Sequence, residues 1–515
     1  MLLRRPRGLE VCAAPLALLA APWLACAADF CISGTVVNAS TGEPLRHAAA
    51  TIPQAATLTD AAGIFRFCGL PAGAYYANAE KPGFTAAGTQ VVIGPSRENI
   101  LLRLQPLAVI KGKVTESGGE PLEKVLIQAL SITTEDGRRK VKVESAVSTD
   151  DRGEYRLPGM AAGPYLLRAA GWQGAASGAK SSDSGETFAA VYYGGATDLA
   201  SAAPLAVAAG SQLDADFSVT LAPSYRIRGV LAGFSALLPP KIELLGPEGD
   251  LSAAPVAFSP ATGVFQISNV APGSYTIRAT ESEGEESRRG EQAVQVGSTD
   301  VNDVLLTLAG TVTLKGAVRV AGASVSSPLP PACSVDVSPA GDSMSQETAV
   351  ESSTSDDGEF EVPSLLPGRY RVKMECANGY IAAAHFGDAD LLARDELLII
   401  PGAPPPRLEA VLNRDGGTLD LAEDTDKEPV TAWLALVPDS GNDLHTRFAI
   451  LKGKLSLSGI APGDYHVYAW VGSPYEFEYA NPEAQRAWAG RAVSVHVAER
   501  VHQSVSLKIA PREPQ

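Results

Sequence analysis

Residues 356–374 read Asp-Asp-Gly-Glu-Phe-Glu-Val-Pro-Ser-Leu-Leu-Pro-Gly-Arg-Tyr-Arg-Val-Lys-Met, and this stretch decides the fold. Every second residue from Phe360 to Val362 and from Tyr370 to Met374 is apolar, and charged residues stand between them. This period of two is typical of a strand that buries one face. Asp-Gly precedes the first run and Pro-Gly the second, and both pairs favour turns. The stretch therefore predicts two strands joined by a turn.

The same pattern occurs five times along the chain. Each copy has two glycines ten residues apart, apolar residues two and four positions after the first glycine, and a tyrosine two positions after the second. The tyrosines are Tyr75, Tyr165, Tyr275, Tyr370 and Tyr465. The first glycines are spaced 90, 110, 95 and 95 residues apart, and units of about 100 residues can bury a core of their own. Five matches in one register indicate an internal repeat, with the tyrosines at equivalent strand positions.

Composition supports an all-β protein of tandem β-sandwich modules. The 515 residues include 49 Gly and 37 Pro, as expected of a turn-rich chain, and 45% are hydrophobic, too many for a disordered one. The expected modules are 29–105 (module one), 106–222 (module two, with a Gly/Ala/Ser-rich insertion), 223–310 (module three), 311–412 (module four) and 413–515 (module five, with an aromatic loop). The start of module five lacks the opening pattern of the other four. Short linkers predict an elongated, semi-rigid array.

Residues 1–28 resemble a secretory signal peptide, with a basic start, an apolar stretch and Ala-Cys-Ala at residues 25–27. We therefore expect export to the periplasm, the outer surface or the extracellular space. An alternative is that Cys26 is the acylated cysteine of a lipoprotein, although Trp23 stands where leucine is usual. No later run is long enough to span a membrane. The formal net charge of −16 argues against nucleic acid and anionic membranes as partners.

Four cysteines follow the signal segment, two in module one and two in module four. An even number within each module of an exported protein predicts the disulfides Cys31–Cys68 and Cys333–Cys376. Cys333 is in phase with apolar neighbours on its strand, and so is Cys376, so both are expected to point into the core of module four.

The recurring residues resemble a known family. The pattern Ile-x-Gly-x-Val, Gly-Glu-Pro-Leu and Asp-x-x-Gly-x-Phe-x-Phe-x-x-Leu-x-x-Gly-x-Tyr is similar to carboxypeptidase regulatory-like domains, in modules one and two most fully. The resemblance implies transthyretin-like (prealbumin-type) or immunoglobulin-like β-sandwiches in exported bacterial proteins. It does not imply one activity.

Catalytic chemistry finds little support in the sequence. The zinc pair of the family's enzymes would be His496-Val-Ala-Glu499, but residues three apart on a strand point to opposite faces. The modules also resemble the B-type repeats of collagen adhesins, whose isopeptide cross-link needs a Glu four residues after the repeated tyrosine, where the five copies have Ala or Met. The acidic run at 424–428 lacks the glycine turn of a known calcium loop. We expect no catalytic residue, no metal and no cofactor.

Aromatic loops are the candidate ligand sites. Module five carries Trp470, Tyr475, Phe477, Tyr479 and Trp488, and the insertion of module two carries Tyr192 and Tyr193. Exposed rings of this kind stack on sugars or proline-rich peptides; the alternative is that they cover the end of a sandwich. Asn481 is expected to cap a short helix that begins with Pro482 and ends before Gly490.

The sequence thus predicts a non-catalytic exported binding or structural protein, with carbohydrate binding as one version. One alternative is a rigid spacer or protein-interaction scaffold without a small ligand. Another is an accessory module array of a peptidase system that itself lacks the catalytic domain. The expected partner is a glycan or a cell-surface or extracellular protein.

Overall fold

The computed structural model describes residues 30–93, 99–172, 185–235, 238–247, 249, 252, 254–283, 286–322, 332–340, 349–394, 396–424, 428–473 and 476–509. The predicted signal peptide, Cys26 and Tyr475 lie outside these residues. The chain divides into two compact units, 1–107 and 108–515, which are considered separately. Within the described residues, neither the length nor the composition of any helix suits a membrane crossing. The elongated arrangement of the modules stays a prediction.

Module one, in the first unit, is a sandwich of two sheets that enclose one apolar core. One sheet has the order β4 (Ile64–Leu70), β1 (Phe30–Asn38), β7 (Asn99–Leu104). The other has the order β3 (Ala55–Leu58), β2 (Ala49–Ile52), β5 (Gly73–Glu80), β6 (Ala87–Ile93). The first strand β1 pairs antiparallel with β4 and parallel with β7.

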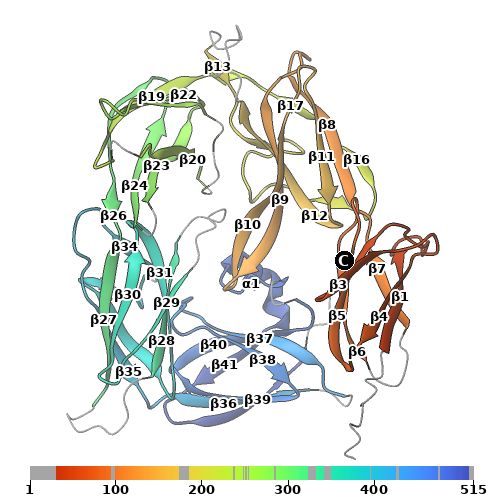
Figure 1. The fold of residues 1–515 in the computed structure, drawn as a ribbon. Helices are drawn as coiled ribbons and strands as arrows, with labels where there is room; N and C mark the ends of the chain where they lie inside the picture. Colours follow the sequence, from red (N-terminus) through yellow and green to blue (C-terminus); the bar gives the residue numbers. More distant parts are fainter. Residues whose placement is uncertain are drawn as a thin grey trace, which may run out of the picture. The chain divides into compact units, whose positions relative to one another are not determined.

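Modules two and three repeat this plan (Figure 1). In module two one sheet is β11 (Glu154–Met160), β8 (Ala108–Glu116), β16 (Gln212–Asp214), with β17 (Phe217–Val219) also on β8. The other sheet has the order β10 (Arg138–Ser148), β9 (Val125–Glu135), β12 (Gly163–Trp172), β14 (Val191–Tyr192), and β15 (Leu205–Val207) also pairs with β12. A separate pair joins β13 (Glu186–Thr187) to β18 (Ala222–Pro223).

Module three also has two sheets. One has the order β21 (Val256–Phe258), β22 (Val264–Val270), β19 (Tyr225–Ala232), β25 (Val301–Thr307), and the other has the order β20 (Lys241–Leu245), β23 (Gly273–Glu283), β24 (Glu286–Val296), β26 (Ala309–Gly310).

Modules four and five differ in how their sheets close. Module four has β30 (Glu359–Leu365), β27 (Val312–Val320), β35 (Leu408–Asn413), β32 (Tyr380–Phe386), β33 (Ala389–Asp390) over β29 (Val350–Ser353), β28 (Cys333–Pro339), β31 (Gly368–Cys376), β34 (Glu396–Ile399). Module five is one sheet of seven strands: β41 (Val493–Val497), β40 (Gly463–Trp470), β37 (Thr431–Pro438), β38 (Arg447–Lys452), β39 (Lys454–Ile460), β36 (Gly417–Glu423), β42 (His502–Leu507). Its two halves join through the pair Lys452–Lys454 and share one core. The all-β sandwich prediction is confirmed.

The five repeated tyrosines occupy equivalent positions, as predicted. Each is the third residue of a strand that begins with glycine: β5, β12, β23, β31 and β40. The hydroxyls of Tyr75, Tyr275, Tyr370 and Tyr465 donate to the carbonyl four residues earlier, at 2.8–3.0 Å. The bond ties the strand to the turn before it, which is the role of a tyrosine corner in immunoglobulin-like sandwiches. Burial raises the pKa of Tyr465 to about 12.

A glycine in the opening strand faces the first aromatic residue of the hairpin in four modules. The cross-strand pairs are Gly34–Phe65, Gly112–Tyr155, Gly229–Phe265 and Gly316–Phe360. A Cβ placed on Gly316 would lie 2.1 Å from Cζ of Phe360, so the ring occupies the space that a side chain would need. The backbone at these positions is extended and would accept any residue. Glycine is needed there because the ring leaves no room for a side chain.

Module five solves the same packing problem with different residues. Leu421 stands where the other opening strands have glycine, and Leu455, its cross-strand partner, replaces the aromatic residue. Both leucines pack in the core of module five, so no ring lies against the opening strand there. This exchange explains why the opening pattern of module five is absent from its sequence.

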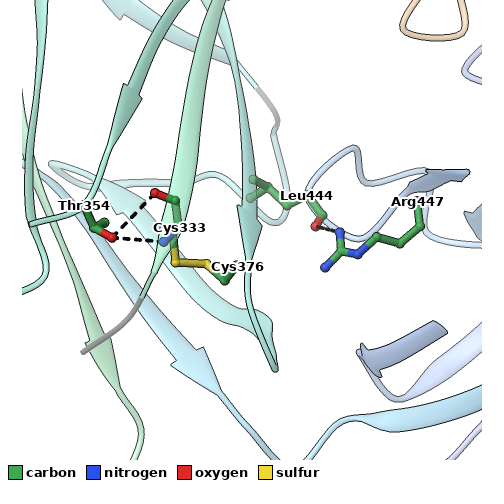
Figure 2. The surroundings of a disulfide bond; sticks show 5 residues. All are labelled: Cys333, Thr354, Cys376, Leu444 and Arg447. Atoms are coloured by element: carbon green, nitrogen blue, oxygen red, sulfur yellow. Dashed lines mark hydrogen bonds between the residues drawn. A yellow bond between two sulfur atoms is a disulfide. The ribbon is translucent and has the colours of Figure 1, made fainter. Parts of the chain in front are cut away.

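Both predicted disulfides are present, in different surroundings. Cys333 and Cys376 face each other directly across β28 and β31, and Cys333 is only 4% exposed (Figure 2). Cys376 is half-buried and packs against the same core. Cys31–Cys68 lies on the outer side of its sheet, where Cys68 is exposed and Arg66 reaches both sulfurs at 3.2 and 3.6 Å.

Modules four and five also share part of a core. Leu444, from the turn after β37, is 1% exposed and belongs to the apolar cluster of module four (Figure 2). Asn442 Nδ2 donates to the carbonyls of Leu391 and Leu392, and a ring nitrogen of His445 lies 2.7 Å from the carbonyl of Ile381. Burial lowers the pKa of His445, so this imidazole tends to stay neutral at the junction.

We expect Gly316→Ala to destabilise module four by about 1–3 kcal/mol, the usual cost of overpacking a core. Phe360 supplies the nearest atoms that the new methyl would meet, so adding Phe360→Leu should recover part of the loss. Calorimetry of the full chain, with hydrogen exchange of β27 and β30, measures both effects. Gly297→Ala is the control because its Cβ would meet no atom within 4 Å. If the double variant were as unstable as the sum of the singles, the packing explanation would be wrong.

A mild reductant should open Cys31–Cys68 before Cys333–Cys376. A thiolate attacks a sulfur that it can reach, and a nearby cation stabilises the leaving thiolate. Exposed Cys68 beside Arg66 meets both conditions, whereas buried Cys333 does not. Alkylation during a reductant titration, followed by mass spectrometry, gives the order. Simultaneous opening, or the reverse order, contradicts the expectation.

Candidate functional site

The aromatic residues of module five form a second small core beside its main one. Trp470, at the end of β40, is 1% exposed, and Phe477 and Tyr479 in the following loop are 0% and 6% exposed. They pack on Tyr468 and on Ala435 and Val437 of β37. Trp470 Nε1 donates to the carbonyl of Ser473 at 2.9 Å, which satisfies its one polar group.

A short helix closes this aromatic core, as the sequence predicts. Helix α1 (Pro482–Trp488) begins after Asn481, whose side-chain oxygen accepts from the amide of Glu483 at 3.0 Å. It carries Trp488 to Phe477, with ring centroids 4.3 Å apart and nearly parallel planes. Arg491, in η3 (Ala489–Arg491), lies 4.8 Å from the indole ring. Trp488 is half-buried and contacts both Phe477 and Arg491.

The predicted ligand-binding rings therefore have different positions. Trp470, Phe477 and Tyr479 are core residues and offer no ring face to a ligand, so the alternative that they cover the module fits them better. Tyr192 is also buried, and half-buried Tyr193 packs edge-on against Phe217 at 6.0 Å. Only half-buried Trp488 and Tyr193 retain part of their exposure among the described members of the set.

The hairpin turn of module two contacts the aromatic loop of module five (Figure 1). Asp136 and Gly137 join β9 to β10 with φ of 48° and 72°, the left-handed pair of a type I′ turn. A Cβ on Gly137 would lie 2.4 Å from the ring of Tyr479, and the amide of Ala480 donates to the Gly137 carbonyl at 2.9 Å. We call this contact between residues 136–139 and 478–480 the clasp.

Ion pairs surround the clasp. Arg138 lies 2.5 Å from Asp443, and Arg139 lies 2.9 Å from Glu478, whose side chain is 13% exposed. Lys373 of module four approaches Asp136 at 3.9 Å. Each pair joins different modules within the second unit, so the charges fix the register of the turn on the loop as well as attract it. Burial, followed by the charges of Asp136 and Asp443, raises the pKa of Tyr479 and keeps its hydroxyl protonated.

A cavity of about 380 Å³ lies beside the clasp. Its walls come from β10, β31 of module four and the segment 478–482 of module five. A second cavity, of about 280 Å³, lies between modules two and three and is lined by Arg168 and Tyr192. Arg168 is 2% exposed and donates to Gln128 at 3.1 Å.

Three of the four histidines of module five lie beside carboxylates on its exposed strand faces. His496 lies 2.7 Å from Asp464, and His502 lies 2.6 Å from Asp420. His466 stands between Ser494, at 3.1 Å, and Asp439, at 3.4 Å. These pairs are open to water, unlike the water-excluded sites in which such groups catalyse. Within the described ranges, His, Cys, Asp and Glu form no cluster of three or more that would suit a metal ion.

Sequence reasoning missed the clasp, although one signal for it was present. Asp136-Gly137 between two alternating runs is a strong sign of a two-residue hairpin, and the basic run 138–140 follows it. Its contacts Asp443 and Glu478 are more than 300 residues away in sequence. Nothing local to either segment indicates that they meet.

The described residues define an all-β protein of tandem transthyretin-like or immunoglobulin-like sandwich modules. Residues 31–104 match the model of the carboxypeptidase regulatory-like domain, so module one is similar to this family in sequence as well as in pattern. Comparison with curated proteins finds no match.

Solved structures with some similarity include two pilins and a further bacterial protein. GBS52, the minor pilin of Streptococcus agalactiae, is 13% identical, with 38% of this chain and 96% of that one covered and a TM-score of 0.22. BcpA, the major pilin subunit of Bacillus cereus, is 11% identical, with 60% and 99% covered and a TM-score of 0.17. The Bacillus anthracis TIE protein is 13% identical, with 85% and 71% covered and a TM-score of 0.18. Similarity at this level carries no argument about function.

Phe477→Ala should destabilise module five by about 3–5 kcal/mol, the usual cost of removing a buried aromatic ring. Trp470 and Trp488 both pack on this ring, so its loss opens the centre of the aromatic core. Glu483→Ala, at an exposed position of α1, is the control and should change stability little. Thermal unfolding of the two variants decides the matter. Equal melting temperatures would show that the loop does not depend on its buried rings.

Proposed function

We propose that the chain is a non-catalytic, exported protein whose β-sandwich modules have a structural or binding role. The observation that carries this proposal is the clasp, which joins module two to module five although two modules separate them in sequence. Contacts of this kind brace a multidomain chain without any reactive group. The two disulfides fit an oxidising compartment, as expected of an exported protein.

The scaffold version of this role fits the buried aromatic loop well. The large aromatic side chains of module five form a core, and the turn of module two packs against Tyr479 of this core. A loop built in this way holds modules at a fixed spacing, which suits a spacer or a platform for another protein. An accessory role in a peptidase system rests on the family resemblance alone.

Carbohydrate binding is the second candidate, and the cavity beside the clasp favours it. The cavity has charged and polar walls from three modules and a volume within the range of small-molecule sites. A glycan array probed with the intact protein tests this version. Binding to no glycan would leave the scaffold version alone.

The clasp is tested by exchanging the charges of one pair. Arg139→Glu should loosen the turn because it places two carboxylates together, and Glu478→Arg should do the same with two guanidinium groups. The double exchange restores opposite charges and should restore the contact. Hydrogen exchange of the Ala480 amide, which donates to Gly137, reports the result locally. We expect faster exchange by several-fold in each single variant and near-normal exchange in the double.

Charge exchange of Lys142 and Glu144, an exposed pair on the same strand β10, is the control. It should leave the Ala480 amide unchanged. Protection of this amide that stays the same in all Arg139 and Glu478 variants would show that the clasp does not hold modules two and five together, and the structural proposal would fail.

A further inference from the structure

The cavity beside the clasp has features of a ligand site that the clasp alone does not explain. It is enclosed by the start of β10, by β31 of module four and by the segment 478–482 of module five. We propose that this cavity binds an uncharged saccharide of one or two rings. The inference rests on the carbohydrate-binding version of the proposed function and gives it a location.

Size limits the ligand first. The volume of about 380 Å³ lies near the lower end of the range for small-molecule sites, which runs from about 300 to 1,000 Å³. A long chain would have to leave the cavity. A ligand of one or two sugar rings fits within it, and the ends of a longer glycan would lie in solvent.

Charge then limits its chemistry. Guanidinium and carboxylate groups of both signs line the cavity, and Arg138–Asp443 and Arg139–Glu478 are already paired. An anionic ligand would meet the carboxylates of four acidic residues in the lining, and a cationic ligand would meet five basic side chains. Hydroxyl groups avoid this conflict because each can donate to a carboxylate and accept from a guanidinium. Asn481 adds an amide that can do both.

The remaining wall is apolar. Pro339 of β28 and Pro482 of α1 line the cavity together with Ala480. Apolar surface of this kind suits the C–H faces of a sugar ring, while the hydroxyls at its edge reach the polar groups. Tyr479 also lines the cavity, but it is a core residue that is only 6% exposed and is not the open aromatic platform that the sequence suggested.

Lys140 is the residue placed to contact the ligand without serving the clasp. It is half-buried, lines the cavity, and has no hydrogen-bond or ion-pair partner for its ammonium among the described residues. Its three donors suit hydroxyl oxygens. Replacing Lys140 should therefore weaken ligand binding without changing the clasp between modules two and five.

The test uses the intact protein and two lysine variants. Isothermal titration with neutral mono- and disaccharides, chosen from the glycan array, gives the affinity of each. Lys140→Ala should weaken binding by about tenfold or more, because it removes hydrogen bonds from a charged donor to the ligand. Lys142→Ala is the matched control: it lies two residues along the same strand, pairs with Glu144 and is outside the cavity. It should bind like the unchanged protein.

Each other outcome overturns a defined part of the proposal. If no saccharide binds, carbohydrate binding fails as a function and this site fails with it. If a saccharide binds equally well to Lys140→Ala and the control, the function stands but its location in this cavity is wrong. If glycylglycine or glucuronate binds more tightly than the neutral sugars, the ligand class is wrong. Unchanged hydrogen exchange at Ala480 in Lys140→Ala would show that any loss comes from the ligand contact.

Discussion

The sandwiches depend on one packing constraint, the contact between the opening strand and the first large side chain of the hairpin. The opening strand lies between an antiparallel neighbour and a parallel one, so its inward positions are crowded from two sides. Glycine makes room there for a ring that fills the middle of the core. Where the ring is absent, as at Leu455, a leucine takes the place of glycine. Glycine is therefore required only where a ring faces it across the strands.

That constraint also shows what the sequence could reveal and what it could not. Period-two alternation and the Gly-x-Tyr step predicted five sets of strands because the signal is local and each residue's role depends on its near neighbours. The cap at Asn481 was predictable for the same reason. The reason why module five lacks the opening pattern was not predictable, because it involves Leu421 and Leu455, which have ordinary strand sequences and meet only in the folded sheet.

The candidate site was harder to predict, since its ring residues gain their meaning from a distant partner. An aromatic loop on the surface and one buried under another module have the same composition. Tyr479 is buried partly because Gly137, more than 300 residues earlier, lies against its ring. Sequence patterns identified the aromatic loop as unusual. They could not decide whether its rings bind a ligand or pack against the hairpin turn of module two.

The clasp combines a requirement of shape with one of charge, and the two depend on each other. A turn with a side chain in place of Gly137 would be held away from Tyr479, and the guanidinium groups of Arg138 and Arg139 would then lie farther from their carboxylates. Half-buried pairs weaken steeply once water enters between them, because the local dielectric rises. The backbone approach at Gly137 therefore sets the strength of the ion pairs. The ion pairs also make the contact specific for the hairpin turn at Asp136-Gly137. The formal net charge of the chain is −16, and few other segments carry clustered cations that could pair with the same carboxylates.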